Sequence, residues 1–156
     1  MAEKTNAMRK LASMKISFKE HYYADTGAIA GADVARALGE DAARVFKTLV
    51  TVGKTGAHYV FLVPVEEELD LKKAAASVGE KSVEMIKSKE LLPLTGYIHG
   101  GCSPIGMKKF FRTVLHKTAA DFPTICFSGG KIGFQIELPP EKLAEVIKFE
   151  YADIIR

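Results

Sequence analysis

The chain has 156 residues, which is enough for one domain with one hydrophobic core and too few for two. Hydrophobic residues make up 47% and charged residues 26%, a globular balance that excludes extended disorder. The net charge of +3 permits contact with phosphates but is lower than that of many dedicated nucleic-acid-binding domains. We therefore expect a single domain over 1–156.

Targeting and metal-binding signals are missing from the sequence. The first ten residues are polar and lack the apolar segment of a secretory signal. No apolar run approaches the roughly 18 residues of a membrane-spanning helix. Cys102 and Cys126 form no CxxC motif and no metal-like cluster with the four histidines. We expect reduced thiols, no metal, no cofactor, no membrane partner and a cytoplasmic location.

Hydrophobic periodicity and turn residues predict the elements of the first half. In chain order they are a helix over 5–15 capped by Thr5, a strand over 16–23, a helix from residue 31 that Gly39 ends, a further helical turn, a hairpin over 45–65, and two short helices over 70–79 and 81–89.

The second half continues with a strand over 110–120, a hairpin over 124–140 and a helix over 139–150 that begins with proline. In the second hairpin, Ile132, Phe134, Ile136 and Leu138 alternate with Gly133, Gln135 and Glu137, which predicts one buried face. Strands and helices mix without regular βαβ alternation, so we predict a single α+β domain with a mixed, curved sheet.

The segment "GYIHGGCSPIGMKK" (96–109) is rich in glycine. Gly101 and Gly106 have the spacing of a phosphate-binding P-loop, but Met107 stands where that motif has lysine, and no Ser or Thr hydroxyl follows for the metal. We therefore do not interpret this loop as a nucleotide-hydrolysing P-loop. Backbone N–H groups of glycines can still approach the oxygens of a ligand closely.

Cys102 has two interpretations. It could be a nucleophile with His99 as its base, but three residues along a loop do not guarantee the contact that such a pair needs. It could instead be a small residue that packs under the loop, which is the interpretation we favour.

Lys47 is the second unusual residue, because it shares a strand face with Val45 and Leu49. A lysine there protects an exposed sheet edge from aggregation, or it is a functional amine that binds a carbonyl or a phosphate. The sequence pattern alone leaves both alternatives open.

Three motifs together resemble one known family. "FKTLV" (46–50), "GYIHGGCSPIGMKK" (96–109) and "SGGKIGFQIELPPEKL" (128–143) are similar, in order and spacing, to the YbaK/EbsC family of aminoacyl-tRNA deacylases. These proteins are free-standing relatives of the editing domain inserted in bacterial prolyl-tRNA synthetase. The resemblance covers nearly the whole chain and implies a mixed, partly barrel-like β-sheet surrounded by helices.

The resemblance also implies a site. Lys47 would hold the terminal adenosine or its phosphate, and the backbone of Gly100 and Gly101 would line the aminoacyl pocket. Tyr23 matches the family tyrosine, with Tyr22 one residue away. The further candidates for the pocket wall and rim are Ser103, Pro104, Asp121, Ser128 and Lys131. Separately, Lys108, Lys109 and Arg112 are cations that could contact tRNA phosphates, although a solvated basic stretch also explains them.

The implied substrate is an aminoacyl-tRNA. The branch that the chain resembles most removes cysteine from proline tRNA, with prolyl-tRNA synthetase as a candidate partner and no DNA partner. Three alternatives stay open: a non-catalytic module that binds tRNA or a synthetase, a thiol-dependent hydrolase using Cys102, and a deacylase for another small amino acid such as alanine.

Overall fold

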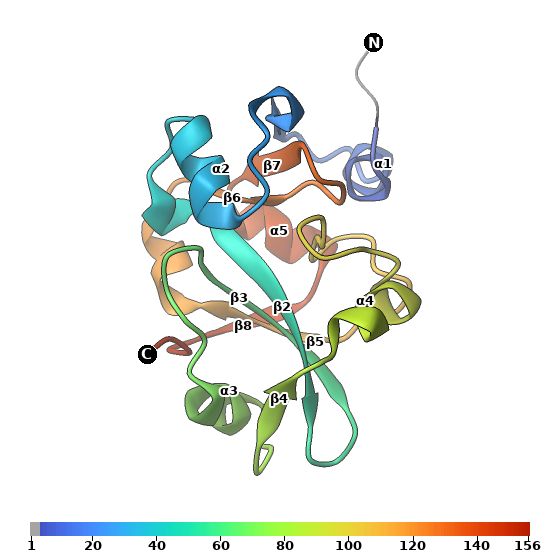
Figure 1. The fold of residues 1–156 in the computed structure, drawn as a ribbon, viewed down its shortest axis with the longest axis vertical. Coiled ribbons are helices and arrows are strands. Elements are labelled where there is room, and N and C mark those ends of the chain that lie inside the picture. Colours follow the sequence, from blue (N-terminus) through green and yellow to red (C-terminus); the bar gives the residue numbers. More distant parts are fainter. Residues whose placement is uncertain (1–3) are drawn as a thin grey trace.

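The computed structural model describes residues 4–156 as a mixed α/β structure (Figure 1). The helices are α1 (Asn6–Ser13), α2 (Gly31–Ala37), α3 (Leu71–Val78), α4 (Ser88–Thr95) and α5 (Pro140–Val146), with short 3-10 turns η1 (Ala24–Thr26), η2 (Ala42–Arg44) and η3 (Lys117–Asp121). The strands are β1 (Lys19–Tyr22), β2 (Phe46–Gly53), β3 (His58–Pro64), β4 (Val83–Met85), β5 (Arg112–His116), β6 (Ile125–Ser128), β7 (Phe134–Leu138) and β8 (Phe149–Ala152). Over these residues, none of the helices has the length and apolar character needed to span a bilayer.

The strands form two sheets. The larger one has the order β4-β2-β3-β5-β8, in which β3, β5 and β8 run parallel and the other pairs are antiparallel. The smaller sheet, β1-β7-β6, is antiparallel. A parallel bridge between Val45 and Cys126 joins them where β2 begins. The two sheets therefore form the mixed, partly closed architecture that the resemblance implied.

The main core lies between the two sheets. Phe46 and Leu62 from the large sheet pack in one buried cluster with Phe127 and Ile136 from the small sheet and Leu143 from α5. A second cluster covers the other face of the large sheet, where α3 packs against β3 and β5. The large sheet is thus apolar on both faces. In Figure 1 the small sheet, α1 and α2 occupy the upper end, and α3 and β4 the lower end.

Most predicted elements are confirmed, including both hairpins and the cap of α1, where the Thr5 hydroxyl accepts from Met8 N at 3.1 Å. The helix predicted over 81–89 is wrong, because Val83–Met85 pairs with β2 as strand β4 and the helix begins only at Ser88. The C-terminal helix ends at Val146, and Phe149–Ala152 pairs with β5 instead. In both places, pairing in the sheet overrides a helix-compatible local pattern.

The predicted single buried face of β7 is also wrong. All five residues of β7 are buried, including Gln135 and Glu137. The polar face is covered by the segment between α2 and β2, which brings Glu40 and Arg44 over the small sheet. A middle strand covered on both sides has no solvent-facing row.

Glu137 is the centre of a buried polar cluster on this covered face. One carboxylate oxygen accepts from His21 Nε2 at 2.7 Å, and the other accepts from Thr124 Oγ1 at 2.7 Å and Arg44 at 3.2 Å. Burial raises the pKa of Glu137, but the hydrogen bonds from Thr124, His21 and Arg44 outweigh it and hold this pKa at about 2. The ionised carboxylate therefore links β1, β7, the start of β6 and η2.

We expect Glu137→Gln to lower the free energy of unfolding near neutral pH by on the order of 2–3 kcal/mol, because the folded state binds the carboxylate form preferentially. Since the folded pKa lies below the ordinary value of 4.5, this contribution is fully present above pH 4.5 and is lost as the pH falls toward 2. Urea unfolding of both proteins at pH 7, 4 and 2.5 measures it.

A matched control is Glu145→Gln, which removes an exposed carboxylate paired with Lys142 and should change stability little at any pH. A stability difference between Glu137→Gln and the wild type that stays constant down to pH 2.5 would contradict the assigned role.

Candidate functional site

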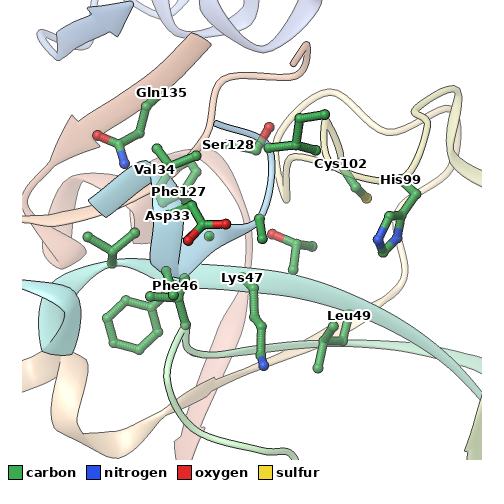
Figure 2. A pocket seen from close by; sticks show the side chains of 18 of the residues that line it. Asp33, Val34, Phe46, Lys47, Leu49, His99, Cys102, Phe127, Ser128 and Gln135 are labelled. Atoms are coloured by element: carbon green, nitrogen blue, oxygen red, sulfur yellow. The ribbon is translucent and has the colours of Figure 1, made fainter. Parts of the chain in front are cut away.

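A cavity of about 830 Å³ lies along one edge of β2 (Figure 2). Its walls come from segments that are distant in the sequence: residues 27–34, β2, the connection from β4 to α4, the glycine-rich loop and the ends of β6 and β7. Apolar side chains such as Val34, Phe46 and Phe127 make up much of the wall. Its volume and its mixture of apolar and polar walls fit a small organic group rather than a bare ion.

The cavity lies where Lys47–Leu49, in the middle of β2, have no strand beside them on this edge among residues 4–156. β4 pairs with Thr51–Gly53, and the small sheet pairs with β2 at the single bridge of Val45. Val65 N donates to Val45 O at 2.9 Å, so alternate residues from Val45 onward direct their backbone groups toward β3. The N–H groups of Phe46 and Thr48 therefore face the other edge, where Phe46 N–H lies at the bridge to Cys126 and Thr48 N–H can bind an oxygen of a ligand.

Lys47 lies at this edge and contributes to the cavity wall. It is half-buried and pairs with Val63 in the sheet. Figure 2 shows Lys47 and Leu49 leaving β2 on one side, while Ser128 and Cys102 lie on the other side of the ribbon in this view. In this view the ammonium group thus lies on the opposite side of the β2 ribbon from Ser128 and Cys102.

The glycine-rich loop divides its candidate residues between the cavity and the core. Gly100 lines the cavity with φ +87°, and a Cβ there would lie 3.0 Å from the side chain of Ile29. A Cβ on Gly101 would lie 3.0 Å from the backbone nitrogen of Ile132, so this glycine permits close packing against the β6–β7 turn. Gly100 therefore shapes the cavity directly, and Gly101 holds the loop in place.

Ser103 and Pro104 belong to the same loop, but they are buried and do not line the cavity. The Ser103 hydroxyl accepts from Ile105 N at 3.3 Å, which stabilises the turn. Their contribution to the site is support of the loop.

Tyr23 and Ser128 both line the cavity. Tyr23 is only 3% exposed, its N–H donates to Gly133 O at 2.8 Å, and burial raises the pKa of its phenol. The neighbouring Tyr22 is 59% exposed, packs edge-on against Phe134 and does not line the cavity. Geometry thus favours Tyr23 over Tyr22 as the pocket tyrosine.

The remaining candidates lie outside the cavity wall. Asp121 and Lys131 are exposed, at the end of η3 and in the β6–β7 turn. Lys108 and Lys109 are exposed in the loop before β5. Arg112 forms an ion pair with Glu150 at 2.9 Å, which occupies part of its hydrogen-bonding capacity.

Sequence patterns missed five polar residues of the wall, which are Asp33, Thr48, Lys87, Ser88 and Gln135, and considered His99 only as a base for Cys102. Thr48 follows Lys47 directly, and Asp33 lies in the first turn of α2. Gln135 had been placed on a solvent-facing row, yet it is 2% exposed. A polar residue between Phe134 and Ile136 in a middle strand is the signal that could have identified it.

Cys102 lines the cavity as a buried thiol. It is 7% exposed, and burial raises its pKa to about 12 despite a hydrogen bond to Thr95, so the thiol is neutral near pH 7. This favours the packing interpretation over a nucleophilic thiolate.

Cys126 belongs instead to the buried polar cluster. The donor atoms of His21, Glu40, Cys126 and Glu137 all lie within 4.8 Å of one another. The sequence had predicted no metal-like group involving the cysteines, and this juxtaposition corrects that expectation. Arg44 lies 3.2 Å from Glu137 and 3.7 Å from Cys126, so its guanidinium charge opposes a second cation there.

Comparison with known proteins assigns the fold and then the family. A crystal structure of a candidate trans-editing enzyme for prolyl-tRNA synthetase superposes with a TM-score of 0.85 at 24% identity and covers 99% of each chain. A crystal structure of a hypothetical protein gives a TM-score of 0.88 at 20% identity, over 97% of this chain and 100% of that one. The predicted YbaK-like fold is thereby confirmed.

Sequence similarity goes further than the fold. A family model described as an aminoacyl-tRNA editing domain matches residues 27–146. A candidate Cys-tRNA(Pro)/Cys-tRNA(Cys) deacylase, EbsC, from Enterococcus faecalis is 46% identical over 153 residues, which cover 97% of this chain and 93% of the relative. The chain belongs to the aminoacyl-tRNA editing domain family.

We expect Cys102→Ala to deacylate a charged tRNA within about threefold of the wild-type rate, because a neutral buried thiol is not the nucleophile. Single-turnover release of the amino acid measures this, and Cys126→Ala provides the matched control, a buried cysteine outside the cavity. A folded Cys102→Ala variant that is about a thousandfold slower would establish the thiol as the nucleophile.

Proposed function

We propose that this protein is a free-standing editing deacylase that removes cysteine mischarged on proline tRNA, with Cys-tRNA(Cys) as a further substrate. The observation that carries the proposal is that Lys47, Gly100 and Ser128 meet around one cavity, although they come from three distant segments that resemble the family motifs. The similarity to EbsC, which covers nearly the whole chain, supports the same substrate.

The proposed chemistry uses the substrate's own thiol. The aminoacyl ester is labile, and the cysteine sulfur attacks the ester carbonyl to form a thiolactone. The C–S bond forms, the bond from the carbonyl carbon to the ribose oxygen breaks, and the thiol proton passes to that oxygen as the tRNA leaves. Holding the thiol beside the carbonyl makes the step intramolecular, which can contribute several kcal/mol.

The protein's part in this reaction is positioning and electrostatic stabilisation. The backbone N–H of Thr48, at the open edge of β2, and N–H groups in the glycine-rich loop can donate to the oxygen that becomes negative. Lys47 would bind the terminal phosphate or adenosine at the border of the cavity. Tyr23 and Ser128 would bound the aminoacyl pocket, with Gly101, Ser103 and Pro104 supporting the loop.

Binding of the tRNA body would rest on the outer surface. Exposed Lys108 and Lys109 are our candidates for phosphate contacts, with Arg112 beside them, and Asp121 and Lys131 at the rim. A chain with a net charge of only +3 gains from a partner that selects the tRNA, so prolyl-tRNA synthetase is a candidate partner. We propose a single deacylase domain over 1–156 that acts in the cytoplasm.

We expect Cys-tRNA(Pro) to be deacylated faster than Pro-tRNA(Pro), because only the first carries a thiol that can attack its own ester. A panel of proline tRNA charged with cysteine, alanine, serine or proline, followed under single-turnover conditions, measures the order. A preference for alanine would assign the chain to another branch, and binding without release of any amino acid would make it a non-catalytic module.

Lys47→Ala should slow turnover roughly ten- to a hundredfold, because such charge-assisted contacts are worth roughly 1.5–3 kcal/mol. Lys47→Arg should recover part of the rate, and Lys54→Ala, in the exposed β2–β3 turn, should leave it unchanged. Deacylation and a thermal melt are measured together.

The edge-protection alternative for Lys47 predicts the reverse pattern, with normal deacylation and greater aggregation of Lys47→Ala. A well-folded Lys47→Ala protein with full activity would remove this residue from the proposed site.

A further inference from the structure

The cavity is larger than the amino acid that the proposed function places in it. Its volume of about 830 Å³ lies within the range of roughly 300–1,000 Å³ that is typical of pockets for drug-sized ligands. A cysteinyl group fills only a small part of such a space. The ester joins this group to the terminal ribose of the tRNA, so the terminal nucleotide lies directly beside it. The rest of the cavity wall is therefore expected to carry groups suited to a nucleotide.

The connection from β4 to α4 supplies such groups. Its residues Met85, Ile86, Lys87 and Ser88 all line the cavity. It runs beside β2, where Ile86 N donates to Val50 O at 3.3 Å (Figure 1). Met85, Lys87 and Ser88 are exposed, so they border the opening of the cavity to solvent. An apolar side chain beside a cation and a hydroxyl suits a nucleotide, which presents a flat base and an anionic phosphate.

The charges of the wall favour an anionic ligand at this opening. Its Asp, Glu, Lys and Arg residues are Asp33, Lys47 and Lys87. The charge of Asp33 is offset by an ion pair with Arg36 at 3.0 Å, whereas Lys47 and Lys87 form no ion pair within residues 4–156. Glu90 Oε1 accepts from the backbone N–H of Lys87 at 3.3 Å, so this carboxylate caps α4, and it does not line the cavity. The wall therefore has a net positive charge.

We propose that Lys87, together with the hydroxyl of Ser88, binds the phosphate that links the terminal adenosine to the rest of the tRNA; this inference rests on the proposed function. That phosphate belongs to the nucleotide that carries the ester, so it is the tRNA charge nearest to the reaction. When the ester is inside the cavity, this phosphate lies toward the opening, which Lys87 and Ser88 border. An ammonium group and a hydroxyl both donate to phosphate oxygens. Lys47 is then left for the adenosine itself.

The exposed lysines before β5 are less suited to this phosphate. Lys108 and Lys109 do not line the cavity, and the side chain of Lys108 lies against Gly96, with Cγ 3.3 Å from the position of a Cβ there. They remain candidates for phosphates farther from the ester. Lys87 therefore positions the terminal nucleotide, and these two lysines contribute to binding of the tRNA body.

The test removes the charge of this one phosphate. Proline tRNA is prepared with either a phosphodiester or an uncharged methylphosphonate before the terminal adenosine, and both forms are charged with cysteine. Single-turnover clearance is followed over a range of protein concentrations. We expect the methylphosphonate to raise the half-saturating concentration of the wild-type protein about three- to thirtyfold, a moderate factor because water screens the charge of an exposed lysine.

Variants of the protein assign the contact. Lys87→Ala should show a similar loss on the phosphodiester and no further loss on the methylphosphonate, because the charged partner is already missing. Lys87→Arg keeps a cation and should stay sensitive to the methylphosphonate. Lys89→Ala is the matched control, since it removes an exposed lysine of α4 that does not line the cavity, and it should behave as the wild type. A thermal melt accompanies each variant.

The outcomes separate this inference from the proposed function. Equal wild-type clearance of both substrates would show that the terminal phosphate is not recognised. A Lys87→Ala protein that is still slowed by the methylphosphonate would show that another group, such as Lys47, binds that phosphate. Either result overturns the inference while the deacylase function stands. A wild-type protein that does not clear the phosphodiester substrate refutes the deacylase function and the inference with it.

Discussion

The arrangement of the whole site depends on the buried Glu137 carboxylate and the three donors that surround it. His21, Thr124 and Arg44 come from the first strand, the start of β6 and the turn before β2. Because a buried charge must be satisfied, these segments can meet in very few ways. Arg44 directly precedes Val45, whose bridge to Cys126 is the one place in residues 4–156 where the small sheet pairs with β2, and beyond this bridge the small sheet departs from the strand.

That departure creates the functional feature of the fold, a strand edge that is buried in a cavity instead of being paired. Unpaired backbone donors are usually a liability, since they attract other strands. Here the 27–34 segment and the glycine-rich loop cover the edge, and a ligand can use the N–H group of Thr48. A site of this kind stabilises charge with the backbone and needs no strong nucleophile, in agreement with the neutral thiol of Cys102.

The sequence predicted the parts of the structure that are determined locally. Both hairpins follow from alternation and turn residues, and Lys47 and Gly100 follow from motifs with characteristic spacing. β4 and β8 were missed because short apolar segments become strands only through their partners β2 and β5. Gln135 was assigned to solvent because nothing near it in the sequence reveals Glu40, which lies 95 residues away. Polar residues that are buried by distant segments cannot be recognised from periodicity alone.

The order of the strands has a consequence for synthesis of the protein. β1 is made early, but its strand partner within residues 4–156 is β7, and the contact of His21 with Glu137 joins residues 116 positions apart in the sequence. The large sheet likewise needs β5 and β8 to complete its parallel half. Contacts of such long range form late in folding. A nascent chain on the ribosome therefore has no cavity until its C-terminal quarter has emerged, and a truncated product would lack the site rather than retain a weakened one.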